Sequence, residues 1–105
     1  MDRKKSLIKQ LKEFKKKLKK VIKINKVLFF GSRAKGKFSK DSDVDLIIVS
    51  DYFNGKNFRS RAVGFYDYWD LDYPVDFLCY TNKEFNELKK QVTIVSEAEN
   101  NGIEI

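Results

Sequence analysis

The first quarter of the chain repeats apolar positions with the spacing of an α-helix. They recur at steps of three and four residues, and lysines fill most of the positions between them. This pattern predicts one amphipathic helix over residues 3–22. A solvated helix face is the simplest interpretation of the lysines, and contact with phosphates is the alternative. The apolar stripe comprises Leu7, Leu11, Phe14, Leu18 and Val21, widened by Ile8 and Ile22.

Three short runs rich in β-branched and aromatic residues predict strands. The first two are apolar at successive positions, which is typical of strands buried on both faces of a sheet. The third reads Val-Asp-Phe-Leu-Cys-Tyr and follows the chain's single proline. The predicted strands cover residues 27–30, 44–49 and 75–80.

A glycine-bounded turn separates the first two strands. Gly31 follows the first strand directly, and Ser32 is a suitable N-cap for a short helix. Gly36 has the conformational freedom to close that helix. Residues 37–42 are polar and predict a loop that leads into the second strand.

The remaining segments predict two further helices and leave the end of the chain open. Apolar residues at helical steps predict a helix over residues 58–69. Thr81 is the predicted N-cap of a helix from about residue 83 to residue 90. Residues 92–95 fit either a last strand or an extension of that helix. Core packing is expected for Phe58, Phe65 and Trp69.

The order of these elements predicts an α/β (α+β) fold with a mixed sheet of three to five strands packed against helices. The chain has 105 residues, of which 42% are hydrophobic, so we expect one domain over residues 1–105 with its own core. A second domain has no room at this length, which argues against two-domain enzymes.

The positive charge of the chain is concentrated at one end. The formal net charge is +7, but residues 1–26 hold 12 basic and 2 acidic residues. Residues 27–105 hold 10 basic and 13 acidic residues and are therefore mildly acidic. A nucleic-acid groove built into a fold usually draws basic residues from several elements, so the overall charge argues only weakly for one.

The residue types exclude several kinds of chemistry. The sequence has no histidine and only one cysteine, Cys79, which excludes an internal disulfide, the usual zinc sites and catalytic triads that need an imidazole. No apolar run is long enough for a membrane span, and no apolar segment typical of a secretion signal follows the basic N-terminus. We therefore expect a cytoplasmic protein without a membrane partner.

Three aspartates stand at the beginnings of predicted strands. Asp43 and Asp45 are two residues apart at the start of the second strand, so their carboxylates point to the same face. Asp76 is near the start of the third strand. Loop and capping roles are the simple interpretation of such acids. Like charges beside a buried strand are costly without a cation, however, and the group suits Mg²⁺, with two ions bound between phosphates and carboxylates.

The turn upstream of these acids strengthens the case for a nucleotide. Gly31 and Ser32 lie where a strand turns into a helix, and the free backbone N–H groups and hydroxyl there suit a phosphate. A phosphate cradle and metal-binding carboxylates are what a nucleoside triphosphate with Mg²⁺ requires.

Together these motifs resemble a known family. The stretch from Gly31 to Gly36, then Ser42-Asp43-Val44-Asp45-Leu46, and later Val75-Asp76-Phe77, resemble the signature of the minimal nucleotidyltransferases of the DNA polymerase beta superfamily. The resemblance is close over residues 27–49 and looser over residues 75–80. It implies a nucleotidyltransferase fold.

The resemblance also implies roles for individual residues. Gly31 and Ser32 would hold the triphosphate of ATP, and Asp43 and Asp45 would bind Mg²⁺. Asp76 would complete the metal site and accept the proton of the attacking hydroxyl. The family pattern leaves the roles of Arg33 and Lys35 open.

Small proteins of this kind are similar to antitoxins whose partner is a helical HEPN ribonuclease, and some of them adenylylate a tyrosine of that toxin. This implies transfer of AMP from ATP to a protein acceptor. The aromatic residues between Tyr52 and Tyr73 are more than a small core needs, and they suit a surface for a partner or for a second copy of the chain. Two alternatives stay open: an antitoxin that binds its partner without catalysis, and nucleotide transfer to RNA through the lysine-rich helix.

Overall fold

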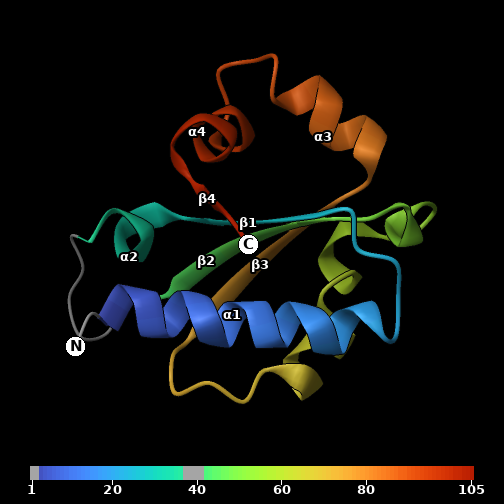
Figure 1. Ribbon diagram of the computed structural model, residues 1–105. Helices are drawn as coiled ribbons and strands as arrows, with labels where there is room; N and C mark the ends of the chain where they lie inside the picture. The colour runs from blue at the N-terminus through green and yellow to red at the C-terminus, as the bar shows by residue number, and fades with distance from the viewer. Residues whose placement is uncertain (1–2, 37–41) are drawn as a thin grey trace.

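The computed structural model describes residues 3–36 and 42–105, and these form one mixed α/β domain (Figure 1). The sheet has four strands, within the predicted range, and helices cover both of its faces. The predicted loop at residues 37–42 lies almost entirely outside the described residues. The helices and strands are α1 (Arg3–Lys19), β1 (Lys26–Phe30), α2 (Gly31–Lys35), β2 (Val44–Val49), β3 (Val75–Tyr80), α3 (Asn82–Leu88), α4 (Ile94–Asn101) and β4 (Ile103–Glu104), with 3₁₀ turns η1 (Asp51–Phe53), η2 (Phe58–Ser60) and η3 (Val63–Tyr68).

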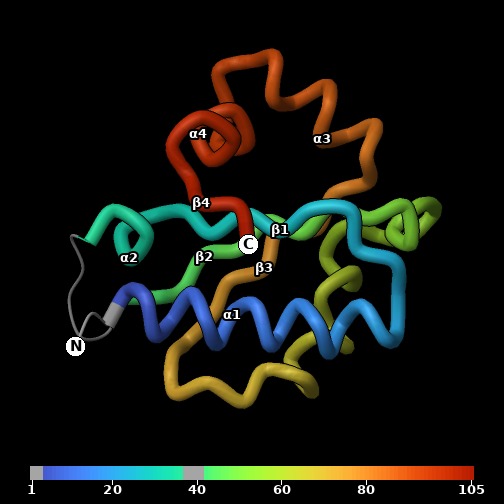
Figure 2. The backbone as a smooth tube through the Cα atoms, viewed as in Figure 1, coloured from blue at the N-terminus to red at the C-terminus, as the bar shows by residue number. Residues whose placement is uncertain are grey.

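The strand order is β3-β2-β1-β4, and the pairing is mixed. β1 runs antiparallel to β2 and β4, whereas β2 and β3 are parallel. The three predicted strands are confirmed, and β1 and β2 are buried on both faces because each is covered from above and below. The short strand β4 brings the end of the chain against β1, as the tube in Figure 2 shows.

Helix α1 packs its apolar stripe on one face of the sheet. Leu11, Phe14 and Leu18 are at most 2% exposed and touch residues of all three long strands through a single core cluster. The helix ends at Lys19, three residues earlier than predicted, and Val21 is 57% exposed. The prediction was wrong there because the chain leaves helical geometry after Lys19, and Ile22 turns into the core in place of Val21.

Helices α3 and α4 cover the opposite face of the sheet. Phe85 of α3 and Val95 of α4 are buried against Ile47 of β2. Thr81 caps α3 as predicted, in a capping box with Glu84. Neither prediction for residues 92–95 was right, because the Thr93 side chain caps a new helix, α4, that begins at Ile94.

The aromatic segment is irregular, and the helix predicted over residues 58–69 is wrong. The chain forms the 3₁₀ turns η2 and η3 there, with Asn57 accepting a hydrogen bond from the Arg59 N–H at the start of η2. Tertiary packing explains the difference: Phe65 is buried edge-on against Phe77, whereas Phe58, expected in the core, is 46% exposed.

None of the described helices is long and apolar enough to cross a membrane.

Candidate active site

The turn after β1 begins a helix without any N-terminal side-chain cap. Helix α2 starts at Gly31, its N-cap is Phe30, and no side chain caps it, so the prediction that Ser32 is the N-cap was wrong. Ser32 instead lies exposed in the first turn, where its hydroxyl is open to a ligand. Gly36 closes the helix in the left-handed region with φ 78°, as predicted.

Gly31 allows a carboxylate to approach the backbone closely. A β-carbon at position 31 would collide with Oδ2 of Asp45, and the φ of Gly31 is +82°, a conformation that side chains disfavour. The pairing of β1 with β2 sets up this contact because Phe30 is the register partner of Asp45. The glycine is therefore required both for the turn and for the position of the Asp45 carboxylate.

The second acid of the site reaches the same place from the neighbouring strand. Asp76 is the register partner of Asp45 in the parallel pair of β2 and β3. Asp45 shares the face of β2 that carries Ile47 and Val49, the face covered by α3 and α4. Asp43 is exposed and precedes β2 by one residue, two positions from Asp45. The structure thus brings the predicted acids and Gly31 to one edge of the sheet.

The acids interact electrostatically. The pKa of Asp45 is raised above its usual value, first by partial burial and then by the negative charges of Asp76 and Asp43. Over the ranges 3–36 and 42–105, no ion pair or hydrogen bond neutralises any of these three carboxylates. Among the described residues the site therefore carries a concentration of negative charge without a paired cation, and a bound cation would reduce the repulsion.

The donor set fits Mg²⁺ bound together with phosphate. No three acidic, cysteine or histidine side chains within the described part of the chain are grouped closely enough to hold a metal by themselves. Mg²⁺ is usually held by one or two carboxylates, water and the phosphates of a substrate, and seldom by a cage made only of protein. Carboxylate oxygens that repel one another beside an open serine suit that mode of binding.

Arg33, whose role the family pattern left open, is buried beside the candidate site. Its side chain is 5% exposed, its Nε donates a hydrogen bond to the Ser42 carbonyl at 2.6 Å, and its guanidinium lies over the Tyr73 ring at 4.6 Å. Ser42 directly precedes Asp43, and Tyr73 lies three residues before Asp76. The sequence of α2 alone gave no signal that Arg33 is buried, because the partners that the structure describes, Ser42 and Tyr73, lie outside α2.

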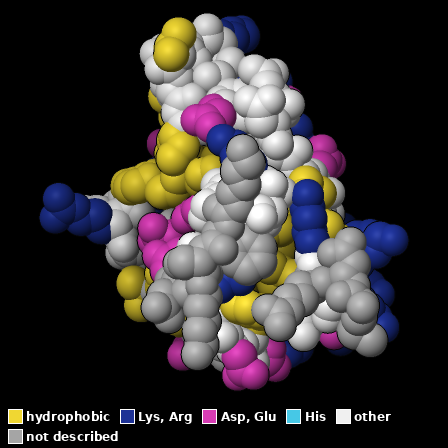
Figure 3. Space-filling view, turned by 90° about the vertical axis from the view of Figure 1, so that its left-hand side faces the viewer, with side chains coloured by type: hydrophobic (Ala, Val, Ile, Leu, Met, Phe, Trp, Pro, Cys, Tyr) yellow, Lys and Arg dark blue, Asp and Glu magenta, His cyan; other side chains and the backbone are white. Residues whose placement is uncertain are grey.

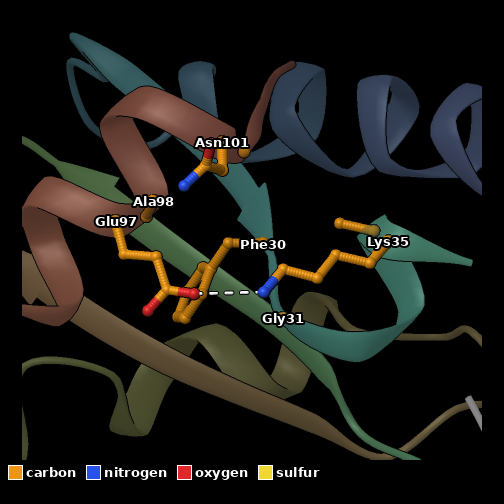
Figure 4. Close-up of a pocket in the computed structure, with 8 residues that line it drawn as sticks. Phe30, Gly31, Lys35, Glu97, Ala98 and Asn101 are labelled. Carbon is orange, nitrogen blue, oxygen red and sulfur yellow. Dashed lines mark hydrogen bonds and ion pairs between the residues drawn. The ribbon is translucent and has the colours of Figure 1, made fainter. Parts of the chain in front are cut away.

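A small hollow adjoins Gly31 between α2 and α4 (Figure 4). The Lys35 ammonium lies 3.1 Å from Oε1 of Glu97 and joins the two helices beside it. The volume is about 10 Å³, which is room for one water molecule and not for a nucleobase. The hollow is lined by Phe30, Gly31, Ala34, Lys35, Glu97, Ala98, Asn101 and Gly102.

Comparison with known proteins identifies the family. Residues 7–104 match the family described as Nucleotidyltransferase domain. The match spans most of the chain, from α1 to β4, and includes every residue of the site. The chain therefore belongs to the nucleotidyltransferase domain family.

Individual relatives agree with this assignment. The chain is 35% identical over 77 residues to "Probable protein adenylyltransferase MntA" of Haemophilus influenzae, which covers 71% of this chain and 68% of that protein. It is 26% identical over 101 residues to "Putative protein adenylyltransferase MJ0141" of Methanocaldococcus jannaschii. This match covers 94% of the present chain and 98% of the relative. The fold also matches the "Crystal structure of a putative nucleotidyltransferase from Sulfolobus solfataricus" with a TM-score of 0.64 and 23% sequence identity. This match covers 85% of the present chain and 79% of that one.

Proposed function

We propose that this nucleotidyltransferase transfers AMP from ATP to a hydroxyl group of a protein, with Mg²⁺ as cofactor. The observation that carries the proposal is the meeting of Gly31, Asp45 and Asp76 at one edge of the sheet. The names of the two relatives support a protein as the acceptor.

In this proposal Gly31 and Ser32 hold the triphosphate, and Asp43, Asp45 and Asp76 hold two Mg²⁺ ions. The ions would stabilise the negative charge that develops on the phosphate oxygens during the reaction. Asp76 accepts the proton of the acceptor hydroxyl, and the hydroxyl oxygen forms a bond to the α-phosphorus. The bond from that phosphorus to the bridging oxygen breaks, and pyrophosphate leaves with the electron pair.

The proposed acceptor is a helical HEPN toxin, which would make the chain the antitoxin of a pair. Four exposed apolar side chains between η1 and η3 support a partner surface in that segment, and the same surface suits a second copy of the chain. They are Tyr52, Phe58, Val63 and Tyr66.

The position of the label in ATP tests the reaction. The protein is incubated with its helical partner, Mg²⁺ and ATP labelled at either the α- or the γ-phosphate. Label from the α-position is expected on the partner, and label from the γ-position is not. Transfer of γ-label, or no transfer in the presence of an authentic partner, contradicts the proposal.

Charge-matched variants test the site. Asp43→Asn with Asp45→Asn is expected to lower transfer at least about 10³-fold, because the charge stabilisation at the reacting phosphate is lost. The control pair Glu13→Gln with Glu87→Gln removes the same charge from exposed positions in α1 and α3, outside the site and the proposed partner surface, and is expected to leave transfer unchanged. Toxin neutralisation that persists without ATP and without both site aspartates favours the non-catalytic alternative.

A further inference from the structure

The exposed side of α1 carries a continuous stripe of lysines. Steps of four, three, four and three residues separate its members, so they share one side of the helix. At 1.5 Å per residue, the part of the stripe within α1 is about 20 Å long. All of its members are exposed: Lys5, Lys9, Lys12, Lys16 and Lys19 in α1, with Lys20 and Lys23 continuing the basic surface beyond its end.

The stripe lies opposite the buried apolar side of the same helix. Leu7, Leu11 and Leu18 face the core and are at most 4% exposed, whereas the lysines project to solvent. In Figure 3 Lys and Arg side chains line the right-hand margin, the side on which α1 lies. The basic surface thus belongs to one rigid element that the core holds in place.

No acid in the part of the chain that the structure describes pairs with the lysines of the stripe. Within residues 3–36 and 42–105, no side-chain hydrogen bond or ion pair involves the lysines of the stripe, and Glu13 is the single acidic residue of α1. The neighbouring Lys17 and Lys15, by contrast, contact Asp70 and the Ile105 carbonyl. Burial, and next the charge of Lys19, lower the pKa of Lys15, which lies beside the stripe.

We propose that the lysine stripe of α1 is a docking surface for the phosphodiester backbone of a polynucleotide. A one-signed row of flexible ammonium groups matches a row of phosphates and reads no base. The described part of the stripe exposes no large apolar residue until Val21, which disfavours a protein partner, because protein interfaces are enriched in aromatic residues and arginine and depleted in lysine. A membrane is disfavoured because the apolar side of α1 is in the core and has nothing to insert.

The stripe and the candidate active site are on opposite sides of the sheet. Asp45 shares a face with Ile47, under α3 and α4, whereas α1 covers the other face. A polynucleotide on α1 therefore docks away from the acids, and its binding does not depend on the proposed function. Binding and transfer are expected to fail independently.

Fluorescence anisotropy with labelled single-stranded 20-mers of RNA and DNA tests the proposal. Because only phosphates are contacted, the two strands are expected to bind within about threefold of each other, with affinity that falls steeply with salt. Lys9, Lys12 and Lys16→Gln should weaken binding at least tenfold at low salt and reduce the salt slope by about 2. A melting temperature within a few degrees of the unmodified protein shows that this variant is folded.

A charge-matched control separates the stripe from net charge. Lys56, Lys83 and Lys90→Gln removes three exposed lysines elsewhere and is expected to change affinity less than twofold. Asp45→Asn should bind as the unmodified protein does. Equal weakening by both lysine variants, no binding at 50 mM salt, or binding to anionic vesicles without binding to either strand overturns the proposal.

Discussion

The carboxylate of Asp45 lies so close to the α-carbon of Gly31 that no side chain fits between them. Gly31→Ala should therefore lose stability for two reasons: the backbone at φ +82° disfavours a side chain, and the new β-carbon displaces the Asp45 carboxylate. We expect a loss of about 2–4 kcal/mol in the free energy of unfolding, of which about 1–2 kcal/mol is backbone strain. Transferase activity should fall at least about 100-fold, because a shift of about 1 Å misplaces the carboxylate. Chemical denaturation and initial rates measure these losses.

Gly36 provides the control for this prediction. Its φ is +78°, but a β-carbon there would meet no atom of the described residues within 4 Å, so Gly36→Ala adds the strain without the collision. In an Asp45→Ala background, where the collision is removed, Gly31→Ala should cost no more stability than Gly36→Ala does. Equal losses of stability for the two glycine variants in the unmodified chain contradict the close approach.

Arg33 should act as a positioning residue for the acids that we propose bind Mg²⁺. Its guanidinium holds the Ser42 carbonyl and the Tyr73 ring, which lie on the segments that lead to Asp43 and Asp76. Arg33→Lys replaces the planar guanidinium with an ammonium group, which cannot keep both the hydrogen bond to Ser42 and the stacking on the Tyr73 ring. We expect the Mg²⁺ concentration for half-maximal transfer to rise about tenfold, with a loss of about 2 kcal/mol in stability.

A comparison with Arg61, which is also buried, distinguishes a positioning role of Arg33 from a purely stabilising one. Arg61 donates hydrogen bonds to Glu84 and to the Cys79 carbonyl at the far end of β3. Arg61→Lys should lose a similar amount of stability and leave the Mg²⁺ dependence unchanged. If both variants shift the Mg²⁺ dependence equally, Arg33 has only a structural role.

The sequence predicted the elements whose pattern is local. Strands β1 and β2 were predicted from consecutive apolar residues, and β3 from its β-branched and aromatic residues, which are properties of each segment alone. Thr81 was predicted because a cap acts within its own turn. The helix over residues 58–69 was wrongly predicted because tertiary contacts of Phe65 with Phe53 and Phe77 override helical spacing.

The candidate site was predictable only in part, for the same physical reason. The spacing of Asp43 and Asp45 indicates a shared face, but the registers that join Asp45 to Asp76 and to Phe30 are properties of the assembled sheet. Arg33 gave no signal because the two partners that the structure describes, Ser42 and Tyr73, lie nine or more residues away. Long-range pairing thus limits what local pattern can predict about a site.

The ion pair of Glu84 with Arg61 should make stability depend on pH in the acid range. The hydrogen bond from Arg61 holds the pKa of Glu84 below its usual 4.5, so the stabilisation is present above pH 4.5 and is lost as pH falls through the lowered pKa. At pH 7 we expect Glu84→Gln to cost about 1–2 kcal/mol, a modest loss because the Glu84 side chain is 40% exposed. The difference between the two proteins in urea denaturation should shrink below pH 4.5. A difference that stays constant down to pH 3 contradicts this account.

Cys79 should be unreactive while the protein is folded. The side chain lies in the core at 2% exposure, and burial raises the pKa of the thiol to about 12, so the reactive thiolate is scarce at pH 8. Alkylation by iodoacetamide should be at least about 100-fold slower in the native protein than in urea, and its rate should follow the unfolding equilibrium. Mass spectrometry of the alkylated chain measures both rates. Rapid labelling without denaturant contradicts the burial of this thiol.

Removing one negative charge from the site should stabilise the metal-free protein. The pKa of Asp45 is raised by burial and by the charges of Asp76 and Asp43, so the folded state holds the ionised Asp45 at a cost. Asp45→Asn keeps the shape of the side chain and removes its charge, so we expect it to raise the melting temperature in EDTA by a few degrees. Saturating Mg²⁺ and a non-hydrolysable ATP analogue should stabilise the unmodified protein by RT ln(1 + [L]/Kd) and should have little effect on the variant. Asp67→Asn, an exposed acid outside the site, should behave as the unmodified protein does in both conditions. A variant that is less stable in EDTA, or that gains as much from Mg²⁺ and nucleotide as the unmodified chain, shows that these acids are not a destabilised cation site.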